Sequence, residues 1–341
     1  MVSVICPVYN EERYIKKCID SLLLQDYPLD DIEIIFVDGG SKDNTLHIIK
    51  QYMQEYKFFY VINNRNRIVP IAMNMGIKFA KGTIIIRLDA HATYAKNYIS
   101  VLVKRLFELN ADNIGCVCKT DVVNKNPKTL AIKEILGNRL GVGNSLFRLG
   151  INKISEVDTV PFGCWRKDVF DKYGYFDSRL VRNQDIEMNK RIKRGGGKIY
   201  IVPDTYCTYF ARETFIEITK NNFNNGKWNI LTVYFTKQLD SLSVRHFVPL
   251  MFVLSIILPV IFSFLFSLFK LLLLPIFLIL LYFLLMFSAS IVLKIKKKLN
   301  VSYLLAGFAV LHFSYGIGSL VGIIKVFMLV LRSLGRKKER M

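Results

Sequence analysis

The chain has 341 residues, of which 52% are hydrophobic and 22% are charged, and its formal net charge is +20. This length allows one α/β domain with an appended segment. A large positive charge can indicate nucleic-acid binding, but no nucleic-acid module is present. Basic residues cluster beside long apolar segments, where the positive-inside rule and anionic lipid headgroups account for them. The six cysteines include no C-x-x-C pair and no zinc spacing, so we expect reduced, mostly buried thiols.

Residues 1–205 alternate strand-like and helix-like segments, which predicts an α/β domain with a mostly parallel sheet. The expected strands are residues 2–6, 32–37, 58–62, 83–88, 115–119 and 198–202. The expected helices follow Asn10, the turn at 38–45 and Pro70, and then span 97–109 and 185–194. Between residues 125 and 150, repeated glycines indicate an irregular region rather than a packed helix.

Three apolar segments follow, at residues 247–269, 271–293 and 301–331, the last interrupted by Lys325. Each exceeds the roughly 18 to 20 apolar residues that cross a bilayer core, so we expect a multi-pass protein of the plasma membrane with membrane lipids as partners. Residues 206–246 mix aromatic and basic side chains, which is typical of an interfacial segment. The expected division is a catalytic domain at 1–205, an interfacial segment at 206–246, a membrane domain at 247–331 and a basic tail at 332–341.

The topology of the membrane segments is left open by the sequence. The first residues turn polar too soon for a signal peptide, which predicts a cytoplasmic catalytic domain. Two spans return the basic residues 294–298 to the cytoplasm, as the positive-inside rule requires, but a third full crossing places the basic tail outside. Gly316, Gly318 and Gly322 would allow the third segment to re-enter or break, so spanning and re-entrant arrangements both stay open.

Three polar segments follow expected strands of the first domain. They begin at Pro7, at Asp38 and at the triplet Asp89-Ala90-His91. Ligands of open α/β sheets bind outside the carboxyl ends of the strands, so Glu11 and Asp38 can converge on one ligand, and Asp89 and His91 can hold a divalent ion against a diphosphate. The structural alternatives are that Asp38 only caps its turn and that His91 is only a polar cap beyond the strand.

Together these segments resemble the family 2 inverting glycosyltransferases with a GT-A fold. The resemblance covers residues 1 to about 230 and is carried by Pro7-Val8-Tyr9-Asn10-Glu11, Val37-Asp38-Gly39-Gly40-Ser41-x-Asp43-x-Thr45 and the Asp89 triplet. Within that family, the chain is most similar to the membrane-bound succinoglycan-type exopolysaccharide glucosyltransferases. That closer similarity is carried by Asn66-Arg67-Ile68-Val69-Pro70-x-Ala72-x-Asn74-x-Gly76 and Arg87-Leu88-Asp89-Ala90-His91-Ala92.

The resemblance implies a donor site and a metal site. Asp38 would bind the nucleobase, and the further donor-binding residues would be Pro7, Val8, Glu11, Arg65, Arg67, Asn74 and Asp89. Asp89 and His91 would stand where the family's D-x-D motif holds the metal. His91 replaces the second Asp of that motif, and an imidazole suits Mn²⁺ better than Mg²⁺, so the expected cofactor is Mn²⁺ or Mg²⁺.

An inverting transfer also needs a base that takes the proton from the acceptor hydroxyl. Asp185, in Asn183-Gln184-Asp185-Ile186-Glu187, resembles the family's catalytic base. Gln184 stands beside it where an acid is common, as a candidate substrate contact, and Glu187 is the rival carboxylate. The structural alternative for Asp185 is an acidic residue favoured at a helix start by the helix dipole.

Three further residues are candidate contacts for the donor sugar or the acceptor. Gly163 would let the backbone approach the substrate, and Trp165 could stack on a sugar, although a buried aromatic fits the sequence almost as well. Trp228 follows Lys227 roughly where processive synthases have Q-x-x-R-W. Only the Trp and a basic neighbour remain, which argues against a cellulose- or hyaluronan-type polymerase, and Lys227 is a candidate contact for the diphosphate leaving group.

The resemblance therefore implies a membrane-anchored inverting glycosyltransferase in cell-surface or exopolysaccharide synthesis. It would move a hexose from a nucleoside-diphosphate sugar, expected to be UDP-linked, to a lipid-linked saccharide acceptor. One alternative is a synthase that loads a sugar onto polyprenyl phosphate. Another is an inactive membrane scaffold, against which the joint retention of Asp38, Asp89, His91 and Asp185 argues.

Overall fold

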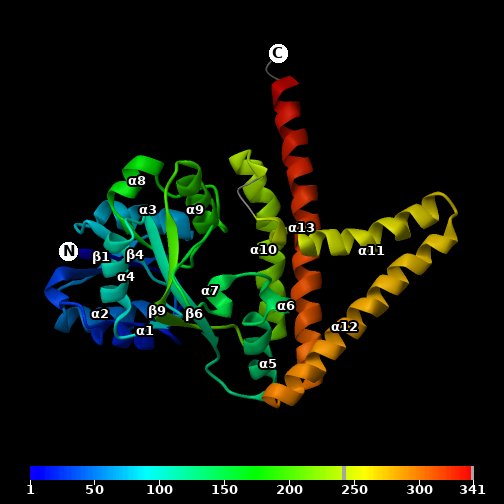
Figure 1. The fold of residues 1–341 in the computed structure, drawn as a ribbon. Coiled ribbons are helices and arrows are strands. Elements are labelled where there is room, and N and C mark those ends of the chain that lie inside the picture. The colour runs from blue at the N-terminus through cyan, green and yellow to red at the C-terminus, as the bar shows by residue number, and fades with distance from the viewer. Residues whose placement is uncertain (240–242, 339–341) are drawn as a thin grey trace. The chain divides into compact units, whose positions relative to one another are not determined.

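The computed structural model describes residues 1–239 and 243–338, with side chains described as far as residue 334 (Figure 1). The chain forms two compact units, Met1–Asp121 with Ser145–Phe210 and Val122–Asn144 with Ala211–Met341. The segment 122–144, which the sequence division left inside the catalytic domain, therefore belongs to the second unit. The functional division into catalytic, interfacial and membrane parts stays a prediction.

The first unit is built on a sheet whose strands are β1 (Val2–Val8), β2 (Ile32–Asp38), β3 (Phe59–Asn63), β4 (Ile84–Arg87), β5 (Ala92–Tyr94), β6 (Asn113–Asp121), β7 (Ser155–Glu156), β8 (Cys164–Arg166) and β9 (Ile199–Phe210). Its helices are α1 (Ile15–Leu23), η1 (Leu29–Asp31), α2 (Thr45–Glu55), α3 (Val69–Phe79), α4 (Tyr98–Glu108), α7 (Leu146–Leu149), α8 (Asp168–Tyr173) and α9 (Gln184–Arg194). The described strands follow the order β3-β2-β1-β4-β8-β6-β9-β5, with β7 paired to β9.

Two parts of the sheet are parallel, namely the N-terminal strands and the pair formed by β6 and β9. Strands β3, β2, β1 and β4 pair in parallel, as the alternation of strands and helices predicted. Strand β8 then runs antiparallel to both β4 and β6, and the β5 and β7 pairings with β9 are antiparallel as well. The sheet is thus mixed, because the short strands that follow β4 enter from irregular segments rather than through crossover helices.

Helices cover both faces of the parallel strands. Alternate residues of β1 point to opposite sides, so Val4 joins one buried cluster and Ile5 joins the other. The first cluster receives apolar side chains from α1, α2 and α4, and the second receives them from α3, α8 and α9. A sheet that is buried on both faces leaves only its strand ends for ligands, which places the candidate site at the carboxyl ends.

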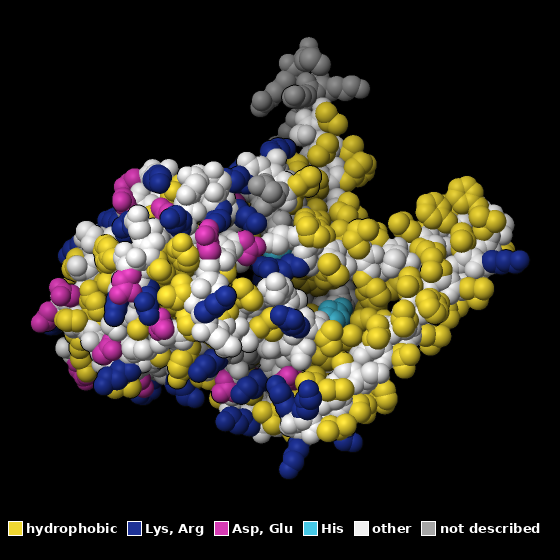
Figure 2. All heavy atoms as spheres, viewed as in Figure 1, with side chains coloured by type: hydrophobic (Ala, Val, Ile, Leu, Met, Phe, Trp, Pro, Cys, Tyr) yellow, Lys and Arg dark blue, Asp and Glu magenta, His cyan; other side chains and the backbone are white. Residues whose placement is uncertain are grey.

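The second unit is helical. Its elements are α5 (Pro127–Leu136), α6 (Arg139–Val142), α10 (Phe215–Thr236), η3 (Val244–His246), α11 (Val248–Leu265), η4 (Phe269–Leu272), α12 (Leu273–Lys297) and α13 (Val301–Lys338). Within the residues that the structure describes, three helical segments are long and apolar enough to cross a membrane, namely Val248–Leu265, Phe269–Lys297 and Val301–Leu334. Hydrophobic side chains cover the exposed surface of α11 and α12 (Figure 2).

The glycines of the third apolar segment do not break it, because α13 is one continuous helix through Gly316, Gly318 and Gly322. They provide close packing instead. A methyl group on Gly318 would overlap the Phe223 carbonyl of α10, and one on Gly316 would overlap the Pro249 carbonyl of α11. Small residues let helix backbones approach closely, as they do in membrane proteins.

Residues 127–136 also correct the expected irregular region. They form the regular helix α5, which begins with a capping box between Asn126 and Thr129. Its Ala131 and Ile135 pack in a buried cluster with Leu304 and Phe308 of α13. The glycines that indicated an irregular region lie after this helix, where Gly137 ends it.

Candidate active site

A pocket opens at the carboxyl ends of β1, β2 and β4. It encloses about 560 Å³ of empty space that is partly open to solvent. The strand ends lie level because Val8 pairs with Asp38 and Ile5 pairs with Arg87. The predicted residues that line the pocket are Pro7, Val8, Glu11, Arg67, Asp89 and His91, and further lining comes from Tyr9, Asn64 and Arg87. Segments far apart in the sequence therefore meet in one cavity.

Arg67 and Tyr9 form one wall of this pocket. Arg67 has a left-handed backbone with φ 58°, and its guanidinium lies 5.5 Å from the centre of the Tyr9 ring. A cation held against an aromatic face keeps a fixed position while its remaining N–H groups can meet an anion. Arg65, the other predicted arginine, is exposed and is not among the lining residues.

Asp38 ends β2 and stabilises the turn that follows. It is only 2% exposed. Its carboxylate accepts hydrogen bonds from the Gly40 backbone N–H at 2.8 Å and from the Ser41 hydroxyl at 2.6 Å. Its neighbours Val37 and Gly39 line the pocket, whereas Asp38 itself does not. The turn-capping alternative describes what this carboxylate does in the structure, and recognition of a nucleobase by Asp38 stays a prediction.

Arg87 is the central charged group of the pocket. It is 6% exposed, and its Nη2 donates to Asp89 Oδ1 at 3.1 Å. Burial acts to lower the pKa of Arg87, but the charges of Asp89 and Asp185 outweigh it and raise that pKa above its ordinary value. Its buried Nε and Nη1 have no hydrogen-bond partner among the described residues. Asp89 and Asp185, which are far apart in the sequence, therefore both act on the buried Arg87 guanidinium, whose Nε and Nη1 remain available as hydrogen-bond donors.

Arg87 was not among the site residues predicted from the sequence, although the sequence carries a signal for it. The strand residues before it are Ile84, Ile85 and Ile86, and a charged residue at the end of such a run is buried with the strand. Buried arginines are rarely without a partner. The Asp89 carboxylate two residues later was the available partner.

Asp185 lies in the first turn of α9, which follows Asn183 in a left-handed conformation. Its side chain is partly exposed and accepts a hydrogen bond from the Ile186 backbone N–H at 2.9 Å. Gln184, its predicted neighbour in the site, is 6% exposed. Asp185 thus combines access to solvent with the electrostatic proximity to Arg87 described above.

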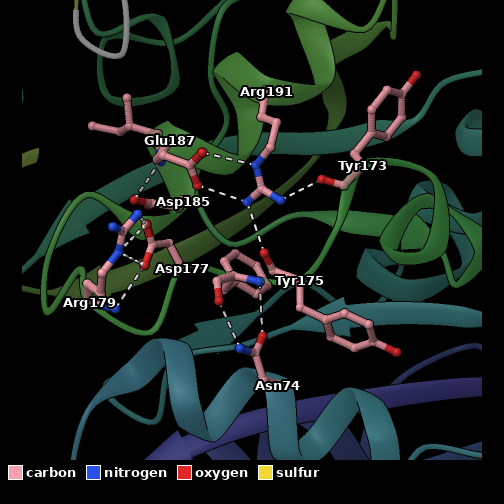
Figure 3. Close-up of polar contacts among 10 residues, drawn as sticks. Asn74, Tyr173, Tyr175, Asp177, Arg179, Asp185, Glu187 and Arg191 are labelled. Atoms are coloured by element: carbon pink, nitrogen blue, oxygen red, sulfur yellow. Dashed lines mark hydrogen bonds and ion pairs between the residues drawn. The ribbon is translucent and has the colours of Figure 1, made fainter. Parts of the chain in front are cut away.

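The rival carboxylate Glu187 has a different environment (Figure 3). It is 5% exposed, and both of its oxygens accept hydrogen bonds from Arg191, at 3.0 and 2.8 Å. The same Arg191 donates to the carbonyl oxygens of Tyr173 and Tyr175. Glu187 is therefore occupied in holding Arg191 and the segment that follows α8, which leaves Asp185 as the accessible carboxylate of this turn.

Asn74 holds the next residue of that same segment (Figure 3). Its side-chain amide donates to the Phe176 carbonyl at 2.8 Å, and its oxygen accepts from the Phe176 N–H at 3.0 Å. Both ends of the amide are engaged, and Asn74 is not among the pocket-lining residues. In this structure Asn74 is a positioning residue, and a direct contact with the donor stays a prediction.

His91 is paired with Glu11 across the pocket. Its Nδ1 lies 3.1 Å from Glu11 Oε1, and its ring packs edge-on against Tyr209 at 4.9 Å between centres. Burial acts to lower the pKa of His91, but Tyr209, the hydrogen bond to Glu11 and the charge of Asp89 raise that pKa to about 10. His91 is therefore held as a cation in this arrangement, with Glu11 as its counter-charge.

The pocket contains side chains that can bind a metal ion, but they do not form a ready metal site. Asp89, Glu11 and His91 all line the pocket, and carboxylates with an imidazole suit Mn²⁺. Asp89 is paired with Arg87, and His91 with Glu11. Among the described residues, no three His, Cys, Asp or Glu side chains form a ready metal site. A cation held here needs these pairs to exchange partners and needs further oxygens, which a diphosphate carries.

Gly163 and Trp165 belong to the core beside the pocket. Gly163 has φ 106°, and a methyl group on it would overlap the Trp165 ring. Trp165 is 1% exposed and packs against Phe170 and Phe176. Its ring has no face open to a sugar, so the buried-aromatic alternative describes Trp165 in this structure. The close approach at Gly163 serves that packing.

Trp228 and Lys227 lie on α10, in the second unit. The Trp228 ring stacks on Phe235 with 6.4 Å between centres. The Lys227 ammonium lies 5.9 Å from the centre of the Phe223 ring. Their predicted contacts with acceptor and diphosphate stay predictions.

Comparisons with known proteins agree on the family. The model of glycosyl transferase family 2 matches residues 3–174. Dolichyl N-acetyl-alpha-D-glucosaminyl phosphate 3-beta-D-2,3-diacetamido-2,3-dideoxy-beta-D-glucuronosyltransferase from Methanococcus voltae is 28% identical over 231 residues, which are 66% of this chain and 71% of that protein. Succinoglycan biosynthesis protein ExoA from Rhizobium meliloti is 26% identical over 250 residues, 72% of this chain and 74% of that protein.

A solved structure shows the same fold. Mannosyltransferase PcManGT from Pyrobaculum calidifontis, in complex with GDP-Man and Mn²⁺, has a TM-score of 0.61 at 16% identity, covering 94% of this chain and 86% of that one. The predicted GT-A fold class with long apolar C-terminal helices is therefore confirmed, as is the resemblance to succinoglycan-type proteins. With a family model that matches half of its length and a pocket built from the motifs of that family, this chain belongs to glycosyl transferase family 2.

Proposed function

We propose that this glycosyltransferase moves a hexose from a nucleoside-diphosphate sugar, expected to be UDP-linked, to a lipid-linked saccharide, with inversion at the anomeric carbon. The observation that carries the proposal is the buried Arg87, which is ion-paired with Asp89 and whose pKa is also raised by the charge of Asp185. One carboxylate lies beside the expected diphosphate position, and the other lies on a different element at the edge of the same charge cluster. That separation of roles is what a displacement on a bound sugar donor requires.

In the proposed reaction, Asp185 accepts the proton of the acceptor hydroxyl while the oxygen of that hydroxyl bonds to the anomeric carbon. The bond between that carbon and the diphosphate oxygen breaks on the opposite face, and the diphosphate leaves with both electrons. Arg67, fixed on Tyr9, and the free donors of Arg87 can hydrogen-bond to the phosphate oxygens. Preformed cations at this position stabilise the charge that develops on the leaving group.

Asp89 and His91 are the residues that would hold Mn²⁺ or Mg²⁺. Because His91 is a cation in this structure, it would have to lose its proton and its bond to Glu11 before it could bind the metal. When bound, the metal would supply positive charge to the diphosphate. Before the donor arrives, Arg87 holds Asp89 in the pocket and Glu11 holds His91 there. These ion pairs offset the repulsion between groups of like charge in the pocket.

The lipid-linked acceptor and the membrane location are inferred from the second unit and from relatives. Three helical segments are apolar enough to span a bilayer. A relative from Methanococcus voltae is named for transfer to a dolichyl phosphate-linked sugar, and another is named for succinoglycan biosynthesis. We infer a multi-pass protein of the plasma membrane with its catalytic unit in the cytoplasm, where nucleotide sugars are made available.

The test uses the full chain in detergent with a panel of radiolabelled nucleotide sugars and two defined acceptors, a polyprenyl-diphosphate saccharide and polyprenyl phosphate. We expect product only with the saccharide, and a β-configured bond from an α-configured donor. Asp89→Asn should abolish Mn²⁺-dependent binding of UDP, measured by calorimetry, while Asp31→Asn, on the exposed η1 helix, should not change it. Transfer to polyprenyl phosphate alone, or retention of configuration, would contradict the proposal.

A further inference from the structure

A second pocket lies in the helical unit, at the link between two candidate membrane spans. It encloses about 1030 Å³ of empty space open to solvent. Its walls come from the end of α12, from the start of α13 and from the residues that begin α5. Its charged lining residues are Lys125, Lys294 and Lys298, and no carboxylate lines it within the part of the chain that the structure describes.

The walls of this pocket are held in place by interactions that do not use its three lysines. Lys297 pairs with Glu134 of α5, at 2.8 Å to the nearer carboxylate oxygen, which ties the end of α12 to that helix. Glu213 accepts hydrogen bonds from the backbone and side-chain nitrogens of Asn124, both at 2.7 Å. Glu134 and Glu213 are therefore engaged next to the pocket, which is itself lined by Lys125, Lys294 and Lys298.

The position of the pocket decides what can fill it. Residues 298–300 connect two helical segments that are each long enough to cross a bilayer, so this link lies at the level of the lipid headgroups if those segments span the membrane. Lys and Arg side chains gather at this end of the helical unit, at the lower edge of the view (Figure 2). Leu130, Leu299 and Val301 supply apolar lining beside the lysines.

Two helices also begin at the rim of the pocket. Asn126 caps α5 by accepting from the Thr129 N–H at 3.0 Å, and Asn300 accepts from the Tyr303 N–H at 3.1 Å at the start of α13. The positive ends of both helix dipoles add to the field of the three ammonium groups. Positive charge from three separate elements thus surrounds a hollow with an apolar edge.

We propose that this pocket binds the phosphate of an anionic membrane phospholipid, with the acyl chains along the apolar helices. The inference rests on the proposed membrane location but not on the glycosyl-transfer chemistry. Basic pockets beside membrane helices recognise anionic headgroups through such charges. The bound lipid joins α5 to the α12–α13 link and so secures the helical unit at the membrane surface.

The test compares two double variants of the full chain, purified in detergent and placed in nanodiscs of phosphatidylcholine with or without phosphatidylglycerol. Lys294→Gln with Lys298→Gln removes two lining lysines, whereas the control, Lys270→Gln with Lys296→Gln, removes two charges that do not line the pocket. Each lysine that meets the bound headgroup contributes roughly a five-fold effect, so the lining variant should bind phosphatidylglycerol about 25-fold more weakly than wild type. The control, whose lysines lie outside the pocket, should bind it less than about three-fold more weakly. Binding is read by native mass spectrometry and by displacement of a labelled phosphatidylglycerol.

Several outcomes would overturn the proposal. An equal loss in both variants would show a diffuse basic surface, and no preference for phosphatidylglycerol would show that the pocket takes no anionic lipid. Displacement by inorganic phosphate at similar concentration would assign the pocket to a soluble anion, and tighter displacement by polyprenyl diphosphate would assign it to the acceptor. UDP binding by the same variants, measured in parallel, shows whether the catalytic unit is intact, so failure here is separate from failure of the proposed reaction.

Discussion

Asp185 and Glu187 stand two residues apart on the same turn of α9, and the structure predicts opposite consequences for their loss. Asp185→Asn keeps the side-chain oxygen that accepts the Ile186 N–H. We expect its free energy of unfolding to change by less than about 1 kcal/mol, because one partly exposed charge is removed and its hydrogen bond is retained. Turnover should fall by about 100- to 10,000-fold, the usual contribution of a general base.

Glu187→Gln should show the reverse. Glu187 is 5% exposed and accepts two hydrogen bonds from Arg191, which is itself partly exposed. Loss of one partner from a buried ion pair costs about 3–5 kcal/mol, and the solvent access of Arg191 reduces this to about 2–3 kcal/mol. A loss of that size lowers the unfolding temperature of a unit of this size by about 4–12 °C. Turnover at a temperature where the variant is folded should stay within about ten-fold of wild type.

Both variants remove one negative charge and preserve side-chain size, so each is the control for the other. Thermal unfolding in detergent reports stability, and transfer from a radiolabelled nucleotide sugar reports turnover. UDP binding by calorimetry should be unchanged in the Asp185 variant. Retained turnover in Asp185→Asn, or lost turnover in Glu187→Gln without a fall in stability, would refute the assignment of the base.

Arg87→Gln should lower turnover by about 100-fold, because a preformed hydrogen-bond donor to the leaving group is lost. Arg87→Lys should restore part of the turnover, and steady-state kinetics with both variants check this. Full activity in the Gln variant would remove Arg87 from the mechanism. Asn74→Ala should lower the free energy of unfolding by about 1–3 kcal/mol, since the two backbone groups of Phe176 lose their partner, with UDP affinity unchanged in a calorimetric titration. A selective loss of UDP affinity would instead return Asn74 to the donor site. Gly226→Leu should prevent α10 from packing on α13, because even a methyl group there would overlap the Tyr315 carbonyl, and gel filtration in detergent should show aggregated protein. Gly196→Ala, which has open space around it but a positive φ, should elute as wild type with only a small loss of stability.

Motif order and hydrophobic pattern were enough to predict much of the first unit. The β-branched runs at residues 32–37 and 83–88 are strands, and Pro70 lies in the first turn of α3, as expected. Since parallel strands end at one edge, the residues after each strand could be assigned to a common pocket. Pro7, Val8, Glu11, Arg67, Asp89 and His91 do line it.

The pattern could not show which polar groups are already engaged. Asp38 and Asn74 are as polar in sequence as Asp89, yet only Asp89 lines the pocket, because Asp38 bonds to its own turn and Asn74 bonds to Phe176. From the sequence, Trp165 is likewise a candidate sugar contact. Only the structure shows that it is buried against Phe170 and Phe176. For Asn74, the partner is Phe176, which is 102 residues away in the sequence.

The sequence by itself determined the family, the strand-end location of the site and the presence of three apolar helices, because each follows from local composition, period or motif. Tertiary structure alone decided that the charge of Asp185 acts on Arg87, that residues 122–144 fold with the helical unit and that the glycines of α13 serve packing. The physical reason is that hydrogen bonds, ion pairs and close backbone contacts are made between segments, and a linear pattern carries each segment's capacity for them but not its partner.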